Sequence, residues 1–88
     1  MANILIVDDE LISRGRIKLL LKTSNAKNMR ILEATGVDEA LSIIHSERIN
    51  VIVIDKVLNN HSARDGDGIE LIPEILSLQP HVQILVPI

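Results

Sequence analysis

Asp8, Asp9 and Asp55 are the residues of this sequence whose type and spacing favour chemistry. Asp8 and Asp9 follow the apolar run Ile4–Val7, and Asp55 ends the run "VIVID". If these runs are neighbouring strands of a parallel sheet, the three carboxylates meet at one edge of it. Clustered carboxylates repel one another, and a hard divalent cation such as Mg²⁺ relieves that repulsion. The three acids therefore predict a cation site beside a carboxylate that can act as a nucleophile.

A simpler interpretation of these acids stays open. An aspartate at the end of a strand commonly caps the helix that follows, or is solvated without any chemical role. A doublet and a third acid, each after an apolar run, favour one shared site over three separate caps.

The elements that must position the acids alternate along the chain. Short apolar runs rich in β-branched residues predict buried strands at Ile4–Val7, Met29–Thr35, Val51–Asp55 and about Val82–Val86. Helical spacing of apolar residues predicts helices from Leu11 to about Thr23, from Val37 to about Glu47, and from about Asp67. This alternation predicts an α/β fold with a parallel sheet between helices. In a doubly wound sheet of order 2-1-3-4, the first and third strands are neighbours.

The spacing of residues also predicts which side of each helix faces the sheet and where the third helix begins. In the first, an apolar face is expected at Ile12, Gly15 and Leu19, with Ile17, Leu20 and Leu21 beside it; its solvent side is expected at Arg14, Arg16, Lys18 and Lys22. In the second, the inward residues are expected to be Val37, Ala40, Leu41 and Ile44. In the third, Asp67 is the expected N-cap, with Glu70 at capping-box spacing. Pro73 lies beyond its first turn and is expected to kink or shorten it.

Composition limits the classes of function. The 88 residues suit one small domain, residues 1–88, and the net charge of −3 gives no reason to expect nucleic-acid or membrane binding. The absence of cysteine excludes disulfides and thiolate metal sites, and it makes the cytoplasm the default location. No apolar stretch approaches the roughly 20 residues needed to span a bilayer. The N-terminus lacks the basic region of a signal peptide.

Four motifs, in this order, resemble the receiver domains of two-component response regulators. "ILIVDDE" is similar to the first strand and acidic pair of that family, and "VIVID" to its phosphoacceptor strand. "EATGVDEAL" resembles its second strand and the start of its second helix, and "DGIEL" the start of its third helix. The resemblance spans essentially the whole chain. It implies a flavodoxin-like fold and a role in phosphorelay signal transduction.

The resemblance also implies a role for each acid. Asp55 would be the phosphoacceptor, Asp9 would bind Mg²⁺ directly, and Asp8 would bind it partly through water. Asp55 and the backbone carbonyl of Val57 would complete the metal ligands supplied by the protein. The donor would be the phosphohistidine of a histidine kinase or phosphotransfer protein, or a small acyl phosphate. We therefore expect a phosphoacceptor domain and not an enzyme, with at most Mg²⁺-dependent self-phosphotransfer and autodephosphorylation.

Two departures from the family pattern carry consequences. Asn59 replaces the usual proline, and the Asp67–Gly68 pair comes about five residues late, so "NHSARDG" is an insertion beside the site. Pro87 or Ile88 stands where the family has a Ser or Thr, and the family's last helix, strand and helix, with a lysine, are missing. The expectation is a truncated receiver-like domain with weakened phosphoryl transfer, since each lost donor costs transition-state stabilisation.

The same departures predict self-association. The fourth strand becomes an exposed edge and the first helix loses its cover, and surfaces of this kind invite pairing. We expect a homo-oligomer, most simply a dimer, through the fourth-strand edge or the first-helix face. The alternative function is a degenerate receiver that acts as an interaction module without phosphorylation. A nucleotide-binding unit is less favoured, because "DDELISRG" has no glycine-rich phosphate loop.

Overall fold

The fold is built on a four-stranded parallel sheet in a computed structural model, which describes all residues except 1, 24–27, 55–56, 59–65, 68–71 and 87–88. The strands are β1 (Ala2–Val7), β2 (Met29–Ala34), β3 (Val51–Ile54) and β6 (Gln83–Leu85). Their order in the sheet is β2-β1-β3-β6, and all three neighbouring pairs are parallel. The predicted α/β class and the predicted strand order 2-1-3-4 are confirmed.

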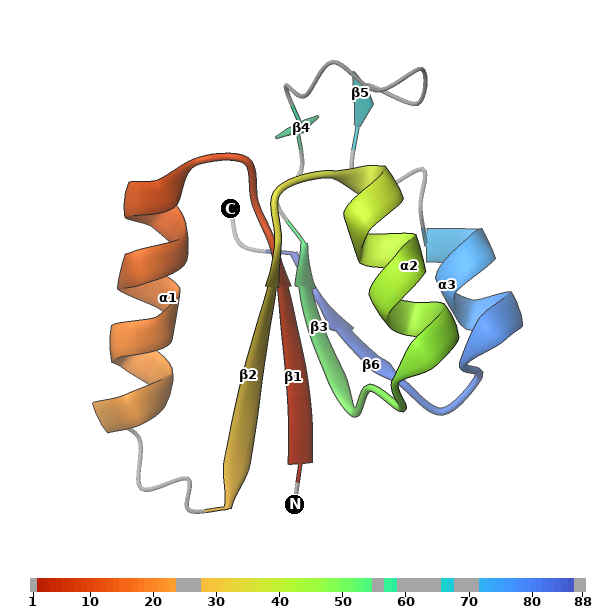
Figure 1. Cartoon of the computed structure of the whole chain (residues 1–88), viewed down its shortest axis with the longest axis horizontal. Coiled ribbons are helices and arrows are strands. Elements are labelled where there is room, and N and C mark those ends of the chain that lie inside the picture. Colours follow the sequence, from red (N-terminus) through yellow and green to blue (C-terminus); the bar gives the residue numbers. More distant parts are fainter. Residues whose placement is uncertain (1, 24–27, 55–56, 59–65, 68–71, 87–88) are drawn as a thin grey trace.

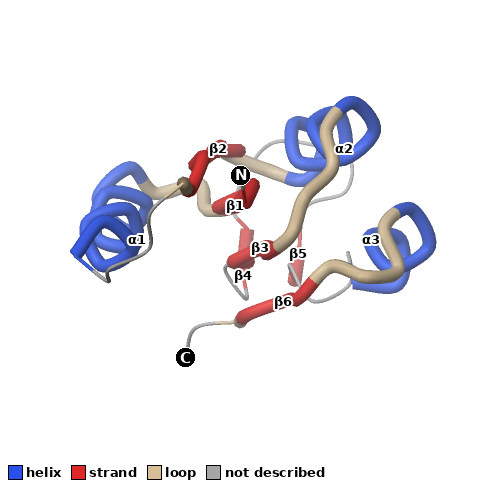
Figure 2. The backbone as a smooth tube through the Cα atoms, turned by 90° about the horizontal axis from the view of Figure 1, so that it is seen from below, coloured by secondary structure: helices blue, strands red, loops and turns tan. Residues whose placement is uncertain are grey.

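Three helices cover the two faces of this sheet (Figures 1 and 2). The helix α1 (Leu11–Thr23) lies on one face, and α2 (Val37–Ser46) and α3 (Ile72–Leu78) lie together on the other. The bounds of α1 are those predicted, and α2 ends one residue before the predicted Glu47.

The main core lies between the sheet and the pair α2 and α3. Its largest completely buried side chains come from β1, β3 and α3: Leu5, Val7, Ile52, Ile54 and Ile75. The four residues predicted to face inward from α2 are all buried there, which confirms the predicted face. Because the chain has no aromatic residue, branched aliphatic side chains fill this space alone.

Gln79, directly after α3, links the end of α2 to the connection before β3 by side-chain hydrogen bonds. Its side-chain amide donates to the carbonyls of Ile44 (2.9 Å) and Glu47 (2.7 Å) and accepts from the amide of Ile49 (2.7 Å). These three bonds satisfy backbone groups at the end of α2 and in the connection to β3. One side chain therefore links both helices to the entrance of β3.

The start of the third helix differs from the prediction. Asp67 is not its N-cap, because Asp67 belongs to the short strand β5 (Gly66–Asp67), which pairs antiparallel with β4 (Val57–Leu58). The helix α3 begins only at Ile72, and Glu70 lies outside the described residues. Pro73 therefore lies in the first turn, where its missing N–H removes no helical hydrogen bond.

The orientation of α1 also differs from the prediction. Ile12, Leu19 and Leu20 are 64–69% exposed, whereas the side chain of Arg14, expected in solvent, is only 12% exposed. The reason lies in β2, where Glu33 carries a carboxylate that bonds to Arg14 and Lys18. Since a charged group at a sheet face needs partners, Arg14 and Lys18 turn toward the sheet. The rest of the predicted face holds in part, because Ile17 and Leu21 are partly buried while Arg16 and Lys22 are exposed.

The strand β6 ends the sheet on one side. Its residue Leu85 is 55% exposed, although its neighbour Ile84 packs against the core. Among the described residues, no helix is long and apolar enough to cross a membrane.

Candidate functional site

The predicted acids follow the central strands of the sheet. Val7, the last residue of β1, is paired with Ala34 on one side and with Ile54 on the other. Asp8 continues the chain from Val7, and its amide donates to the carbonyl of Ala34 (3.0 Å). Asp55 continues the chain from Ile54 but lies outside the described residues, so its part in the site stays a prediction.

Asp8 is the one polar residue buried in the described part of the chain, with 5% of its surface exposed. Its Oδ1 accepts a hydrogen bond from the amide of Glu10 (2.9 Å), which holds the carboxylate over the turn into α1. A buried carboxylate is costly unless donors or a cation compensate its charge. Its position therefore fits a site that gathers positive charge.

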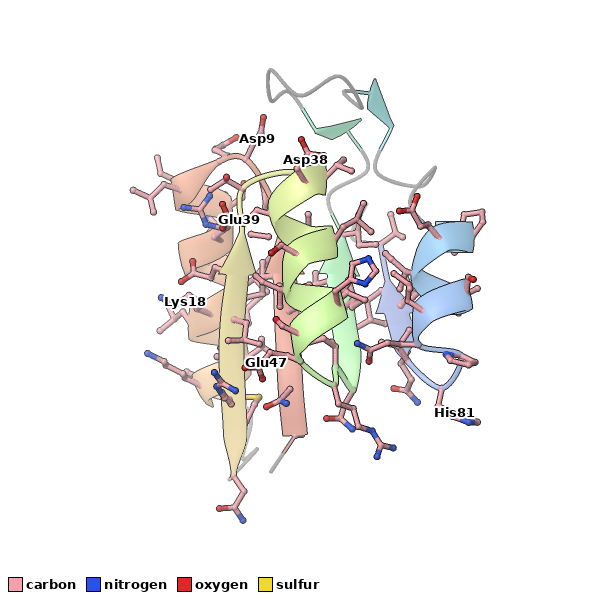
Figure 3. All side chains as sticks on the ribbon, turned by 45° about the vertical axis from the view of Figure 1, so that its right-hand side comes forward. Asp9, Lys18, Asp38, Glu39, Glu47 and His81 are labelled. Carbon is pink, nitrogen blue, oxygen red and sulfur yellow. The ribbon has the colours of Figure 1, made fainter. Side chains whose placement is uncertain are left out.

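Further acids surround this end of the sheet. Asp9, which is partly buried, lies at the same end of the molecule as Asp38 and Glu39, the acids of the first turn of α2 (Figure 3). Both are exposed, and the hydroxyl of Thr35 donates to the carboxylate of Glu39 (3.2 Å). Several negative charges at one end of a small domain attract cations to it.

A cluster of three charged residues joins α1 to β2 next to the acids. The guanidinium of Arg14 donates from Nε to Oε1 of Glu33 (3.2 Å) and from a terminal nitrogen to the backbone carbonyl of Asp8 (2.8 Å). The ammonium of Lys18 donates to the second oxygen of Glu33 (3.2 Å). Burial raises the pKa of Glu33, but the hydrogen bonds and charges of Lys18 and Arg14 outweigh it, so the pKa lies below its ordinary value.

The sequence interpretation missed Arg14 and Glu33 as residues of this site. A signal was present, because Glu33 interrupts the apolar run of the second strand. Arg14 and Lys18 are spaced four apart, which puts both on one side of a helix. A carboxylate in a strand and a pair of cations at helical spacing predict an interaction between the two elements.

The chemistry of the available ligands fits a hard cation. Carboxylate oxygens of Asp8 and Asp9 and a backbone carbonyl are the donors that Mg²⁺ and Ca²⁺ prefer. The remaining predicted ligand, Val57, lies in β4, which is paired with β5 beyond the carboxyl ends of the sheet strands (Figure 1). Within the described residues no three His, Cys, Asp or Glu side chains are close enough to hold a metal, and the third predicted acid lies outside them.

A depression of about 510 Å³ lies at the opposite end of the molecule, between the ends of α2 and α3. Gln79 and His81 are among its lining residues, and Figure 3 shows His81 far from Asp9. This depression is therefore separate from the acids.

Comparisons with known proteins agree with this fold. A family model described as "Response regulator receiver domain" matches residues 4–87. A response regulator from Burkholderia pseudomallei, solved with a phosphorylated aspartic acid, a calcium ion and citrate, is 29% identical, with a TM-score of 0.80 over 98% of this chain and 46% of that one. The MaeR response regulator bound to beryllium trifluoride is 22% identical, with a TM-score of 0.82 over 99% of this chain and 66% of that one. No curated protein matches the sequence.

The chain thus spans about half the length of the first of these proteins and about two thirds of the second. The family model covers nearly all of it, and the strand order β2-β1-β3-β6 is the flavodoxin-like order that the sequence motifs implied. The chain belongs to the response regulator receiver domains.

Proposed function

We propose that this receiver domain accepts a phosphoryl group on Asp55, with Mg²⁺ held by Asp8, Asp9, Asp55 and the backbone carbonyl of Val57. The observation that supports it is the pairing of Val7 with Ile54, since these residues directly precede the acidic pair and the acceptor. The phosphorylated aspartic acid and calcium ion of the Burkholderia pseudomallei relative support the same chemistry here.

The proposed step is the transfer of a phosphoryl group from the donor to the carboxylate of Asp55. A carboxylate oxygen of Asp55 attacks the phosphorus of the donor, and the new O–P bond forms as the P–N bond of a phosphohistidine, or the P–O bond of an acyl phosphate, breaks. The donor leaves with the bonding electron pair. Mg²⁺ would neutralise charge on the phosphoryl oxygens. Asp8, fixed by the amide of Glu10, and Asp9 would supply oxygen ligands.

The partners follow from this chemistry. The donor in the cell would be a histidine kinase or a phosphotransfer protein, and the domain would act in the cytoplasm. The reaction consumes one phosphoryl group per chain, so the domain would work as a signalling acceptor with, at most, Mg²⁺-dependent autodephosphorylation.

Incubation with acetyl phosphate and Mg²⁺, followed by intact mass measurement, tests the proposal. The native chain is expected to gain the mass of one phosphoryl group, and Asp55→Asn is expected to gain none. Chelation of the metal should abolish the gain. An equal gain in Asp55→Asn, or no gain in the native chain at saturating Mg²⁺, would contradict phosphorylation of Asp55.

A second candidate function, an interaction module that is not phosphorylated, is favoured by the exposed apolar residues. Leu11, Ile12, Leu19 and Leu20 on α1 and Leu85 on β6 are 55–72% exposed. Large exposed apolar side chains in one region are typical of interaction surfaces. Under this candidate the native chain binds a partner or itself but gains no phosphoryl mass.

Either function is compatible with a homo-oligomer, and we propose a dimer through the β6 edge. The residues of α1 include four cations and no acid, so two copies of α1 facing each other would bring like charges together. Among the described strands none pairs with the outer edge of β6, so this edge offers backbone groups for pairing beside Leu85. Light scattering should show that Leu85→Lys shifts the chain toward monomers while Leu19→Lys does not. A native chain that is monomeric at micromolar concentration would contradict the dimer.

A further inference from the structure

We propose that Arg14 is a positioning residue for the acidic site, because it holds the main chain of Asp8 and thereby fixes the turn that carries Asp8 and Asp9. This inference rests on the proposed function, since it concerns the same cation site. It adds a residue that does not touch the cation or the acceptor.

The contacts of Arg14 are those of a clamp. Its guanidinium donates to the carbonyl of Asp8 (2.8 Å) and to Glu33 (3.2 Å), and its side chain is only 12% exposed. The backbone amide of Arg14 donates to the carbonyl of Glu10 (3.1 Å), so the residue lies one turn into α1. The planar guanidinium holds its donors in a rigid fork, whereas the three donors of an ammonium rotate at the end of a flexible stem.

The bond from Arg14 is one of three described bonds that hold Asp8. Its amide bonds to Ala34 in β2, its Oδ1 to the amide of Glu10, and its carbonyl to Arg14. The first two bonds come from the backbone, so Arg14 supplies the side-chain contribution among them. Without it, the carbonyl of Asp8 loses this hydrogen bond, so the peptide between Asp8 and Asp9 is held less firmly, and with it the amide and side chain of Asp9.

Glu33 makes the clamp compatible with a cation. A lone guanidinium beside the acids would repel a divalent ion, but the carboxylate of Glu33 offsets its charge at 3.2 Å. Residues that orient metal ligands from outside the coordination sphere commonly change metal affinity by about 10–100-fold when replaced. Arg14 fits the role of such an orienting residue, because it bonds to the backbone of Asp8 and not to the proposed cation.

Lys18 is a matched control within the same cluster. It carries the same charge and bonds to the same carboxylate at the same 3.2 Å, but none of its described contacts reaches Asp8. Figure 3 shows Lys18 farther along α1 from Asp9. Replacing Lys18 therefore measures the effect of removing one positive charge while the hydrogen bond from Arg14 to the carbonyl of Asp8 is kept.

Calorimetric titration of Mg²⁺ into the native chain, Arg14→Met, Arg14→Lys and Lys18→Met tests the inference. Both Arg14 variants are expected to bind Mg²⁺ about tenfold more weakly, and Lys18→Met is expected to stay close to native. If charge alone mattered, Arg14→Met would bind more tightly and Arg14→Lys would be unchanged. That result, or equal weakening in Lys18→Met, would overturn the inference while leaving the proposed function intact.

Hydrogen exchange of the Glu10 amide gives a second readout that needs no metal. This amide bonds to Asp8, so it should exchange faster in Arg14→Met and Arg14→Lys than in the native chain or Lys18→Met. Unchanged exchange in the Arg14 variants would overturn the inference. If the native chain does not bind Mg²⁺, the proposed function fails, and the Glu10 exchange alone then decides whether Arg14 positions the turn.

Discussion

The two faces of the sheet hold their helices by different forces. Beneath α2 and α3, buried aliphatic side chains from three strands and two helices form one continuous core, with Ile84 of β6 packed against it. On the other face, α1 has no buried residue, and its inward side carries Arg14 and Lys18 bonded to Glu33. The first face therefore depends on apolar burial, whereas the second combines the burial of Ile4, Ile6 and Val53 with charged hydrogen bonds.

Because of this difference, we expect one face to determine mainly the stability of the fold and the other to determine mainly the orientation of the acidic side chains. Apolar burial is strong but has no direction, so it fixes helices in place without fixing single atoms. Charge-assisted hydrogen bonds have preferred lengths and angles. Asp8 and Asp9 follow β1 and precede α1, so they belong to the segment that these directional bonds hold. The comparison predicts that core changes alter mainly stability, whereas changes to the charged cluster alter mainly the site.

The largest effect on the core face is expected for Ile75→Ala. This α3 residue is completely buried, and removing its side chain should lower the free energy of unfolding by about 2–5 kcal/mol. The matched control is Leu76→Ala on the same helix, which is 41% exposed and should lose much less. Urea unfolding followed by circular dichroism measures both. Equal losses would contradict the assignment of α3 to the core.

The next effect is expected for Gln79→Ala. The change leaves the amide of Ile49 and the carbonyls of Ile44 and Glu47 without this partner, which should cost roughly 1–3 kcal/mol. Gln79→Glu should also be destabilising, because a carboxylate cannot donate to the two carbonyls. Urea unfolding is again the measurement. A neutral Gln79→Ala would mean that water replaces these bonds without loss.

A smaller effect, dependent on pH, is expected from the charged face. Because the pKa of Glu33 is lowered in the folded chain, its ion pairs stabilise the fold above its ordinary value of 4.5, and this contribution is lost as the pH falls through the lowered pKa. Glu33→Gln should therefore be less stable than native near neutral pH, by about 1 kcal/mol or less because Glu33 is one-third exposed. The difference should shrink in acid. Thermal unfolding of the native chain and of Glu33→Gln from pH 3 to pH 7 measures this difference in stability. A difference that grew as the pH fell would contradict the prediction.

The smallest effect is expected for Leu19→Ser. This side chain is 64% exposed on the outer side of α1, so its removal should change the free energy of unfolding by less than about 0.5 kcal/mol. Urea unfolding of the isolated chain, at a concentration where it is monomeric, measures the change. A loss as large as that of Ile75→Ala would show that α1 packs through its leucines, as the sequence pattern suggested, and would break the contrast between the two faces.

The core face is the part that the sequence predicted well. The apolar runs gave the strands and their order, and the inward residues of α2 are those expected from helical spacing. These predictions succeed because apolar burial follows residue type and period alone. The adjacent ends of β1 and β3, which carry Asp8 and precede Asp55, followed from the same pattern.

The predictions failed where a pairing between distant residues overrode a local pattern. Asp67 and Glu70 have capping-box spacing, but the pairing of Asp67 with Val57 moved the start of α3 to Ile72. Leu19 and Leu20 have the spacing of a buried face, but the bonds of Glu33 to Arg14 and Lys18 bring another side of α1 to the sheet.

The sequence by itself thus determined the family, the sheet and the place of Asp8 and Asp9 after β1, because these depend on residue type, order and period. Only the tertiary structure decided which side of α1 meets the sheet and that Arg14 reaches the carbonyl of Asp8. The physical reason is that a charged group partly removed from water must find a partner wherever the chain brings one. Glu33 and Arg14, nineteen residues apart, meet only after β2 and α1 are in place.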